Sequence, residues 1–160
     1  MTNSGDDNMK ITVGVDPGVT GGISVDFDGD VEVYKMSTTH IEIKEFFQKF
    51  KSIKENQIHV YIEKVSPNNI WGKKTHWVLS ANAHSLKQCI MDFGIPFTEV
   101  APNTWMRYLK IKPKMKNETD SIWKGRLYEQ AKQLYPKTKF NKKMADSVLI
   151  MHYGKKVWRE

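Results

Sequence analysis

Between residues 11 and 36, the chain has runs in which apolar and polar positions alternate with the period of two that is typical of β-strands. Two such runs lie on either side of the segment 16–22, and their apolar members are Ile11, Val13, Val15, Ile23, Val25 and Phe27. A turn sequence, Asp-Gly-Asp at 28–30, follows, so the segment 31–36 is predicted to return as a third strand. We therefore expect three strands in a meander to open the domain.

The apolar spacing then changes to that of an amphipathic helix, with a stripe formed by Ile43, Phe46, Phe47 and Phe50. Thr39 and Glu42 have the spacing of a capping box that would start this helix. A fourth strand is predicted over 58–62 and ends at Glu63. A polar loop to about residue 76 follows, and then a helix over about 77–93, with Gly94 as its C-terminal cap. The segment 97–100 is predicted to form a fifth strand.

The remainder of the chain is predicted to be mainly helical. We expect Asn103 to cap a short helix and Ser121 to cap a longer one. The apolar stripe of the longer helix is Trp123, Leu127, Ala131 and Leu134, and Pro136 would stop it. The segment 110–117 between these two helices is expected to be extended or loop-like. A last helix is predicted from about Lys142 to Tyr153. Strands and helices thus alternate as in an α/β domain.

Length and charge narrow the class of protein. The 160 residues predict a single domain over residues 9–160, preceded by a frayed polar tail over residues 1–8. The formal net charge of +7 favours a polyanionic partner such as nucleic acid, although a basic domain with no such partner is the alternative. No apolar run is long enough for a membrane helix, and we expect a cytoplasmic protein. The single cysteine, Cys89, is expected to be a buried, unreactive thiol.

Three acidic residues stand at strand ends or inside an apolar segment, where a carboxylate is costly unless it is paired or bound to a metal. Asp16 ends the first strand, Glu63 ends the fourth, and Asp146 lies in the last helix. Each alone could be structural: a turn former, a solvated strand end or an exposed helix position. Their joint placement favours a Mg²⁺ site, because clustered carboxylates repel one another and Mg²⁺ prefers oxygen ligands. Two such ions can activate a water and stabilise the leaving oxygen of a phosphodiester.

Three segments that contain these acids resemble the motifs of RuvC-type Holliday-junction resolvases. They are 13–18 (Val-Gly-Val-Asp-Pro-Gly), 60–65 (Val-Tyr-Ile-Glu-Lys-Val) and 144–148 (Met-Ala-Asp-Ser-Val), and the resemblance extends from about residue 10 to residue 153. The segment 97–105, with Pro102, Asn103 and Trp105, is similar to the family's fifth strand and the short helix after it. Lys124 and Arg126 are similar to the family's basic residues near the active site. A short stand-alone resolvase of this kind would suit a phage.

The resemblance implies a ribonuclease H-like fold, with a central mixed five-stranded sheet flanked by helices. It also implies a homodimer that cuts four-way DNA junctions by paired nicking with Mg²⁺, or Mn²⁺ as a substitute. The implied metal ligands are Asp16, Glu63 and Asp146, with two ions in each active site, and Lys124 is the further implied catalytic residue. The family pattern has a fourth acid one helical turn before the last aspartate, and this chain has Lys143 there.

Two alternatives therefore stay open. The first is a protein that binds branched DNA with little or no cleavage, because Lys143 replaces the fourth acid. An actin-like or sugar-kinase-like nucleotide binder is the other, because Asp16, Gly18 and Thr20 also fit the first phosphate loop of those proteins. Such proteins close two large lobes on ATP, whereas this chain is long enough for only one.

Basic and aromatic residues suggest where DNA would lie. In an extended segment, the alternating residues Lys110, Lys112, Lys114 and Lys116 would place four ammonium groups on one side, where phosphates could bind. Arg126 is predicted to contact the DNA as well. Lys73 and Lys74 form a second basic patch in the loop after Glu63. In that same loop, Ile70 or Trp71 is predicted to act as an apolar wedge at the junction centre. The alternative is that Trp71 packs onto the core, because tryptophan is highly buried on average. The dimer interface is predicted on the helix 77–93, through Leu79, Ala83, Leu86 and Ile90, which could equally belong to the core.

Overall fold

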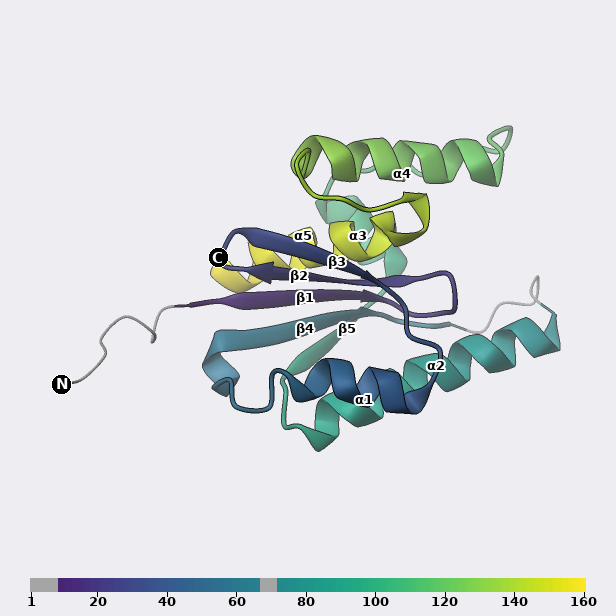
Figure 1. The fold of residues 1–160 in the computed structure, drawn as a ribbon. Helices are drawn as coiled ribbons and strands as arrows, with labels where there is room; N and C mark the ends of the chain where they lie inside the picture. Colours follow the sequence, from purple (N-terminus) through teal and green to yellow (C-terminus); the bar gives the residue numbers. More distant parts are fainter. Residues whose placement is uncertain (1–8, 67–71) are drawn as a thin grey trace.

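The computed structural model describes residues 9–66 and 72–160, which form one sheet with helices on both faces (Figure 1). The strands are β1 (Ile11–Asp16), β2 (Gly22–Phe27), β3 (Asp30–Lys35), β4 (Ile58–Glu63) and β5 (Phe97–Val100), and their order in the sheet is β3-β2-β1-β4-β5. The first three strands are antiparallel, whereas β4 is parallel to β1 and to β5. The predicted mixed five-stranded sheet is confirmed. Because β1 and β4 are parallel neighbours, Asp16 and Glu63 lie at the same edge.

Helices α1 (His40–Gln48) and α2 (Lys73–Asp92) cover one face of the sheet. The other face carries α3 (Pro102–Tyr108), α4 (Asp120–Leu134) and α5 (Ala145–Arg159), of which α5 contacts β1, β2 and β4 directly. Two short 3₁₀ helices, η1 (Glu55–Gln57) and η2 (Lys142–Met144), precede β4 and α5. Within residues 9–66 and 72–160, no helix combines the length and the apolar character that a membrane crossing requires.

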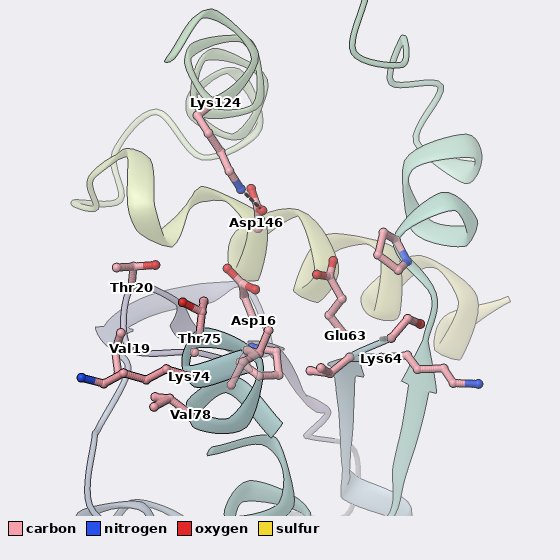
Figure 2. A pocket seen from close by; sticks show the side chains of 16 residues that line it. Asp16, Val19, Thr20, Glu63, Lys64, Lys74, Thr75, Val78, Lys124 and Asp146 are labelled. Atoms are coloured by element: carbon pink, nitrogen blue, oxygen red, sulfur yellow. Dashed lines mark hydrogen bonds and ion pairs between the residues drawn. The ribbon is translucent and has the colours of Figure 1, made fainter. Parts of the chain in front are cut away.

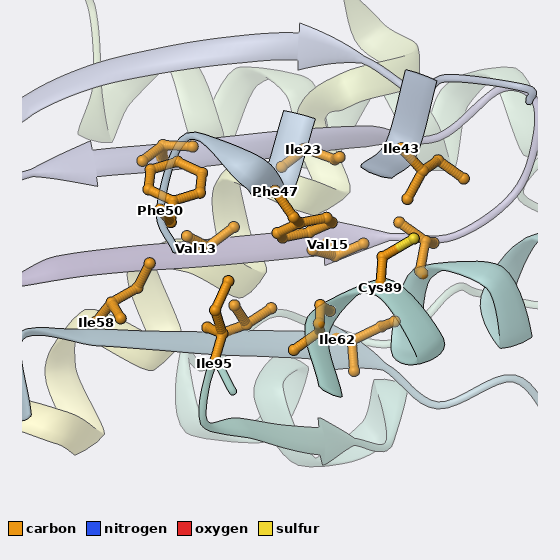
Figure 3. Close-up of a cluster of buried hydrophobic side chains, with 14 of the residues drawn as sticks. Val13, Val15, Ile23, Ile43, Phe47, Phe50, Ile58, Ile62, Cys89 and Ile95 are labelled. Carbon is orange, nitrogen blue, oxygen red and sulfur yellow. The ribbon is translucent and has the colours of Figure 1, made fainter. Parts of the chain in front are cut away.

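The core between the sheet and α1 and α2 is built from alternate strand residues and one face of each helix (Figure 3). Leu86 and Ile90 of α2 are fully buried in it, and Ala83 is 6% exposed. Leu86 and Ile90 therefore belong to the core, which is the alternative that the sequence left open for these residues, and they are not available to a dimer interface. Cys89 is buried on the same side, as expected.

The opposite face of the sheet admits an unusually close helix. A Cβ atom on Gly14 would lie 2.3 Å from the backbone nitrogen of Met151, so only glycine lets α5 approach β1 this closely. A Cβ atom on Gly154 would likewise lie 2.2 Å from the ring of Tyr61. The sequence predicted that this last helix would end at Tyr153, but α5 continues through Gly154 to Arg159. The close packing fixes the start of α5, and with it Asp146, against the sheet.

Three other helix starts differ from the predictions. α2 begins at Lys73, one turn earlier than predicted, because a polar first turn carries no apolar periodicity; Lys73 and Lys74 therefore lie on a helix and not in a loop. α3 begins with Pro102 after Ala101, so Asn103 is not its cap, since the fixed φ of proline suits the first helical position. α4 is capped by Thr119, whose hydroxyl accepts from the Ile122 amide, and not by Ser121.

Candidate active site

The carboxylates of Asp16, Glu63 and Asp146 point toward one another in a cleft of about 750 Å³ (Figure 2). Side chains alternate between the two faces of a strand. Val15 and Ile62 face the core under α1 and α2, so Asp16 and Glu63 face α5. Asp146 meets them from the first turn of that helix. The structure thus brings together the three acids that the sequence singled out.

Lys124 reaches into the cleft from α4 and forms an ion pair with Oδ2 of Asp146 (Figure 2). Burial alone would lower the pKa of this lysine, but the charges of Asp146, Asp16 and Glu63 outweigh that effect and raise it. Lys124 therefore stays protonated and offsets part of the negative charge of the three acids.

Glu63 receives a hydrogen bond from a fully buried indole. Nε1 of Trp105, in α3, donates to Oε2 of Glu63 over 2.8 Å. Burial raises the pKa of Glu63 to about 7, a shift that the Trp105 hydrogen bond opposes and the charge of Asp146 reinforces. The sequence associated Trp105 with the family's short helix but gave no sign of this contact.

The pKa of Asp16 is raised by its surroundings as well. Burial, and then the charges of Asp146 and Glu63, raise its pKa well above the ordinary value, although Lys124 opposes them. Three acids crowded in this way favour any cation that can neutralise them.

The loop after β1 holds Asp16 in place. Gly18, whose φ of +111° suits glycine, donates its backbone amide to Oδ1 of Asn82 over 2.8 Å. The amide of Asn82 in turn donates to the carbonyl oxygen of Ser37 over 3.3 Å. Asn82 therefore ties α2 to the loop, a role that the sequence analysis missed because Asn82 lies 64 residues from Gly18.

The donor set of the cleft suits a hard divalent cation. Carboxylate oxygens are the ligands that Mg²⁺ prefers. Oδ1 of Asp146 is buried and lacks a hydrogen-bond partner among the described residues, so it is available as a ligand. Within residues 9–66 and 72–160, however, no group of three acidic, histidine or cysteine side chains is close enough to hold a metal ion without movement. An ion held by all three carboxylates would therefore require them to draw closer together.

Neither a protein-family model nor a curated protein sequence matches the chain. Among solved structures, the chain is similar to RuvC of T. thermophilus in complex with a Holliday junction substrate, with a TM-score of 0.64 and 14% identity over 94% of this chain and 95% of that one. A second RuvC structure from Thermus thermophilus gives a TM-score of 0.59 and 14% identity over 93% of this chain and 95% of that one. The chain has the fold of RuvC. The expected ribonuclease H-like fold is thereby confirmed.

On this RuvC fold, one of the predicted DNA-binding lysines lies in the wall of the cleft that α2 forms, and a second lies next to it. Lys74 lines the cleft, and Lys73 is its neighbour on the exposed first turn of α2. The side chains of Lys64 and Lys74 point away from the carboxylates, toward opposite sides of the cleft (Figure 2). Basic groups thus flank the acids.

The alternating lysines lie on the loop between α3 and α4 and are all exposed. Lys110 has a left-handed backbone, with a φ of +56°, so the segment is not extended over its whole length. Lys114 is paired with Asp120. None of the four is among the described residues that line the cleft.

Arg126 has a structural set of partners. Its guanidinium donates to both carboxylate oxygens of Glu118, over 2.6 and 2.8 Å, and to the carbonyl oxygens of Lys112 and Pro113. These bonds hold the lysine-bearing loop against α4. Arg126 is not among the described lining residues of the cleft.

The remaining predicted residues lie outside the cleft or outside the described part of the chain. Ile70 and Trp71, the predicted wedge, lie outside the described residues. Lys143 is exposed on η2, three residues before Asp146, and does not line the main cleft as described.

Proposed function

We propose that this protein is a metal-dependent endodeoxyribonuclease that resolves Holliday junctions by paired nicking. The observation that carries the proposal is a convergence of three acids beside Lys124. Asp16 and Glu63 end adjacent parallel strands, and Asp146 of α5 meets them in the cleft. The fold supports it, because the RuvC structure that this chain resembles is described as a complex with a Holliday junction substrate.

In this proposal Asp16, Glu63 and Asp146 would hold Mg²⁺, or Mn²⁺ as a substitute, with two ions per site. When bound, such ions stabilise charge on a phosphodiester and activate water for attack. The chain's own residues do the positioning: Trp105 orients Glu63, and Asn82 supports the loop that follows Asp16. The ammonium group of Lys124, once released from Asp146, lies where it can balance charge on the phosphate.

The partner that we propose is branched DNA, bound by a homodimer. Lys73 and Lys74 would contact phosphates beside the cleft, and the lysine-bearing loop would contact one arm of the junction. Ile70 or Trp71 stays a prediction for the junction wedge. A homodimer supplies two active sites at a fixed spacing, as symmetric nicking requires. Its interface must use a surface other than the buried face of α2, and a monomeric mass by light scattering would contradict it.

A nicking assay on synthetic four-way junctions with Mg²⁺ tests the proposal. We expect the wild type to cut, and Asp16→Asn and Asp146→Asn to bind the junction but lose at least about tenfold in rate, or ~1.4 kcal/mol of barrier. Asp30→Asn, which changes an exposed acid on β3, is the matched control and should cut normally. Equal rates for Asp16→Asn and the control would remove the direct role of Asp16.

A binding protein that does not cut is the second candidate. Two observations favour it: Lys143 stands where the family pattern has an acid, and the three carboxylates are not yet close enough to hold a metal. Junction binding with no nicking in either Mg²⁺ or Mn²⁺ would support this candidate. Stabilisation by ATP in a thermal unfolding assay would instead favour nucleotide binding.

A further inference from the structure

A second hollow lies beside the main cleft. It has a volume of about 500 Å³ and is formed by the loop after β1, the end of β3 and η2. Its described lining residues are Val19, Thr20, Gly21, Lys35, Asn141, Lys142, Lys143 and Met144. Val19 and Thr20 also line the main cleft, so the two hollows adjoin at this loop.

The hollow carries three positive charges and no acidic side chain among its described lining residues. Lys35, Lys142 and Lys143 are exposed, and within residues 9–66 and 72–160 none of them forms an ion pair. Lys124 and Lys155, by contrast, are paired with Asp146 and Asp26. The three free ammonium groups therefore attract an anion into the hollow.

The hollow is connected to the candidate catalytic residues through η2 and α5. Lys143 precedes Asp146 by three residues, and η2 runs directly into α5. Nζ of Lys142 lies 3.7 Å from the position that a Cβ atom on Gly125 would take, so this side chain lies near the residue that follows Lys124. An anion held here would therefore lie next to the cleft that holds the carboxylates.

The chemistry of the hollow suits a phosphate of a DNA backbone. Lysines act as point charges that attract phosphates without reading the base sequence. A strand whose scissile phosphate lies at the carboxylates continues past the cleft, and the loop that carries Val19 and Thr20 is where the two hollows meet.

We propose that Lys35, Lys142 and Lys143 form a subsite for a backbone phosphate next to the phosphodiester that is cut. This inference rests on the proposed function. It also assigns a role to Lys143. The family pattern has an acid at this position, whereas here the lysine would help to hold the DNA strand.

The test compares two double variants that remove the same charge. Lys35→Gln with Lys143→Gln alters the hollow. Lys44→Gln with Lys51→Gln alters exposed lysines on and just after α1, which covers the opposite face of the sheet, and is the control. Junction binding is measured without divalent metal over a range of salt concentrations, and single-turnover cutting is measured with Mg²⁺.

We expect the hollow variant to lower the slope of log K against log salt by about one, because it loses one phosphate contact and each contact contributes about 0.9. Its single-turnover rate should fall about tenfold or more, since the scissile phosphate is held less well. The control should match the wild type in both measurements, and Lys143→Arg should keep the wild-type slope. Circular dichroism and the melting temperature show whether each variant is folded.

A hollow variant with the slope and rate of the control would overturn the subsite while leaving the proposed nuclease intact. Equal losses in both double variants would also overturn it, because the effect would then be one of net charge. A wild type that binds no junction would end both proposals. If the wild type binds the junction but does not cut it, the proposed nuclease activity is contradicted. The salt dependence of junction binding then still tests the subsite.

Discussion

Glu63 and Trp105 show how a single hydrogen bond can position a metal ligand. Trp105→Phe keeps most of the buried ring but removes the donor to Oε2 of Glu63. Because partners of metal ligands commonly contribute 10- to 100-fold in affinity or activity, we expect the Mg²⁺ concentration for half-maximal cutting to rise by about tenfold or more. A Mg²⁺ titration of the cutting rate measures this effect.

The control for this prediction is Trp158→Phe, which changes a half-buried indole at the end of α5. An unchanged Mg²⁺ titration in Trp105→Phe, with a melting temperature like that of the wild type, would show that Glu63 does not depend on this bond.

The pH dependence of stability follows from the same carboxylate. The pKa of Glu63 is about 7 in the folded chain against an ordinary value of 4.5, so the folded state holds this proton more tightly. The associated stability is fully present below about pH 4.5 and is lost as the pH rises to about 7. Without metal, Glu63→Gln should therefore gain stability over the wild type across this range, reaching about 1–3 kcal/mol at pH 8.

Urea unfolding of metal-free protein at pH 5 and pH 8 measures the difference. Mg²⁺ should stabilise the wild type more than Glu63→Gln, because it neutralises the carboxylate that the variant lacks. A difference between the two proteins that stays constant with pH would contradict the assigned pKa.

The sequence could reveal the acids but not the residues that support them. Asp16, Glu63 and Asp146 were conspicuous because a carboxylate at the end of an apolar strand or inside an apolar helix is costly unless it is paired or bound to a metal. Trp105 and Asn82 look like ordinary helix residues. Their partners lie 42 and 64 residues away along the chain, and only the tertiary fold brings them together.

At the level of elements, strand and helix types were predictable because apolar periodicity reports which face is buried. The ends of the helices were less predictable. The start of α2 has a polar first turn, and Gly154 looks like a helix end although the helix continues through it to pack against Tyr61. A close approach of this kind depends on a distant partner and leaves no local signal.

Gly14 provides a test of how tightly α5 packs on the sheet. Its Cβ in Gly14→Ala would lie 2.3 Å from the backbone of Met151, which cannot move aside as a flexible side chain can. We expect a loss of about 3 kcal/mol or more in the free energy of unfolding. Gly72→Ala is the control, because a Cβ there has no neighbour within 4 Å among the described residues. Similar stabilities of the two variants in denaturant unfolding would contradict this packing.

For the whole molecule, the charge of +7 and the fold together favour a DNA partner. The lysine-bearing loop offers an internal comparison, because Lys112 has no acidic partner within the described part of the chain, whereas Lys114 is paired with Asp120. Lys112→Gln should lower the slope of log K against log salt by about one, and Lys114→Gln should lower it less. Salt titrations of junction binding measure both slopes. Unchanged slopes in both variants would place the DNA away from this loop.

The central claim is paired, metal-dependent cutting, and a supercoiled plasmid with an extruded four-way junction tests it most directly. Products are followed over time with Mg²⁺ and compared with those from a plasmid that lacks the junction. We expect the wild type to produce linear DNA with little nicked circle, Asp16→Asn to produce neither, and the plasmid without the junction to stay intact. A wild type that binds the junction but leaves the plasmid uncut in both Mg²⁺ and Mn²⁺ would rule out metal-dependent cutting.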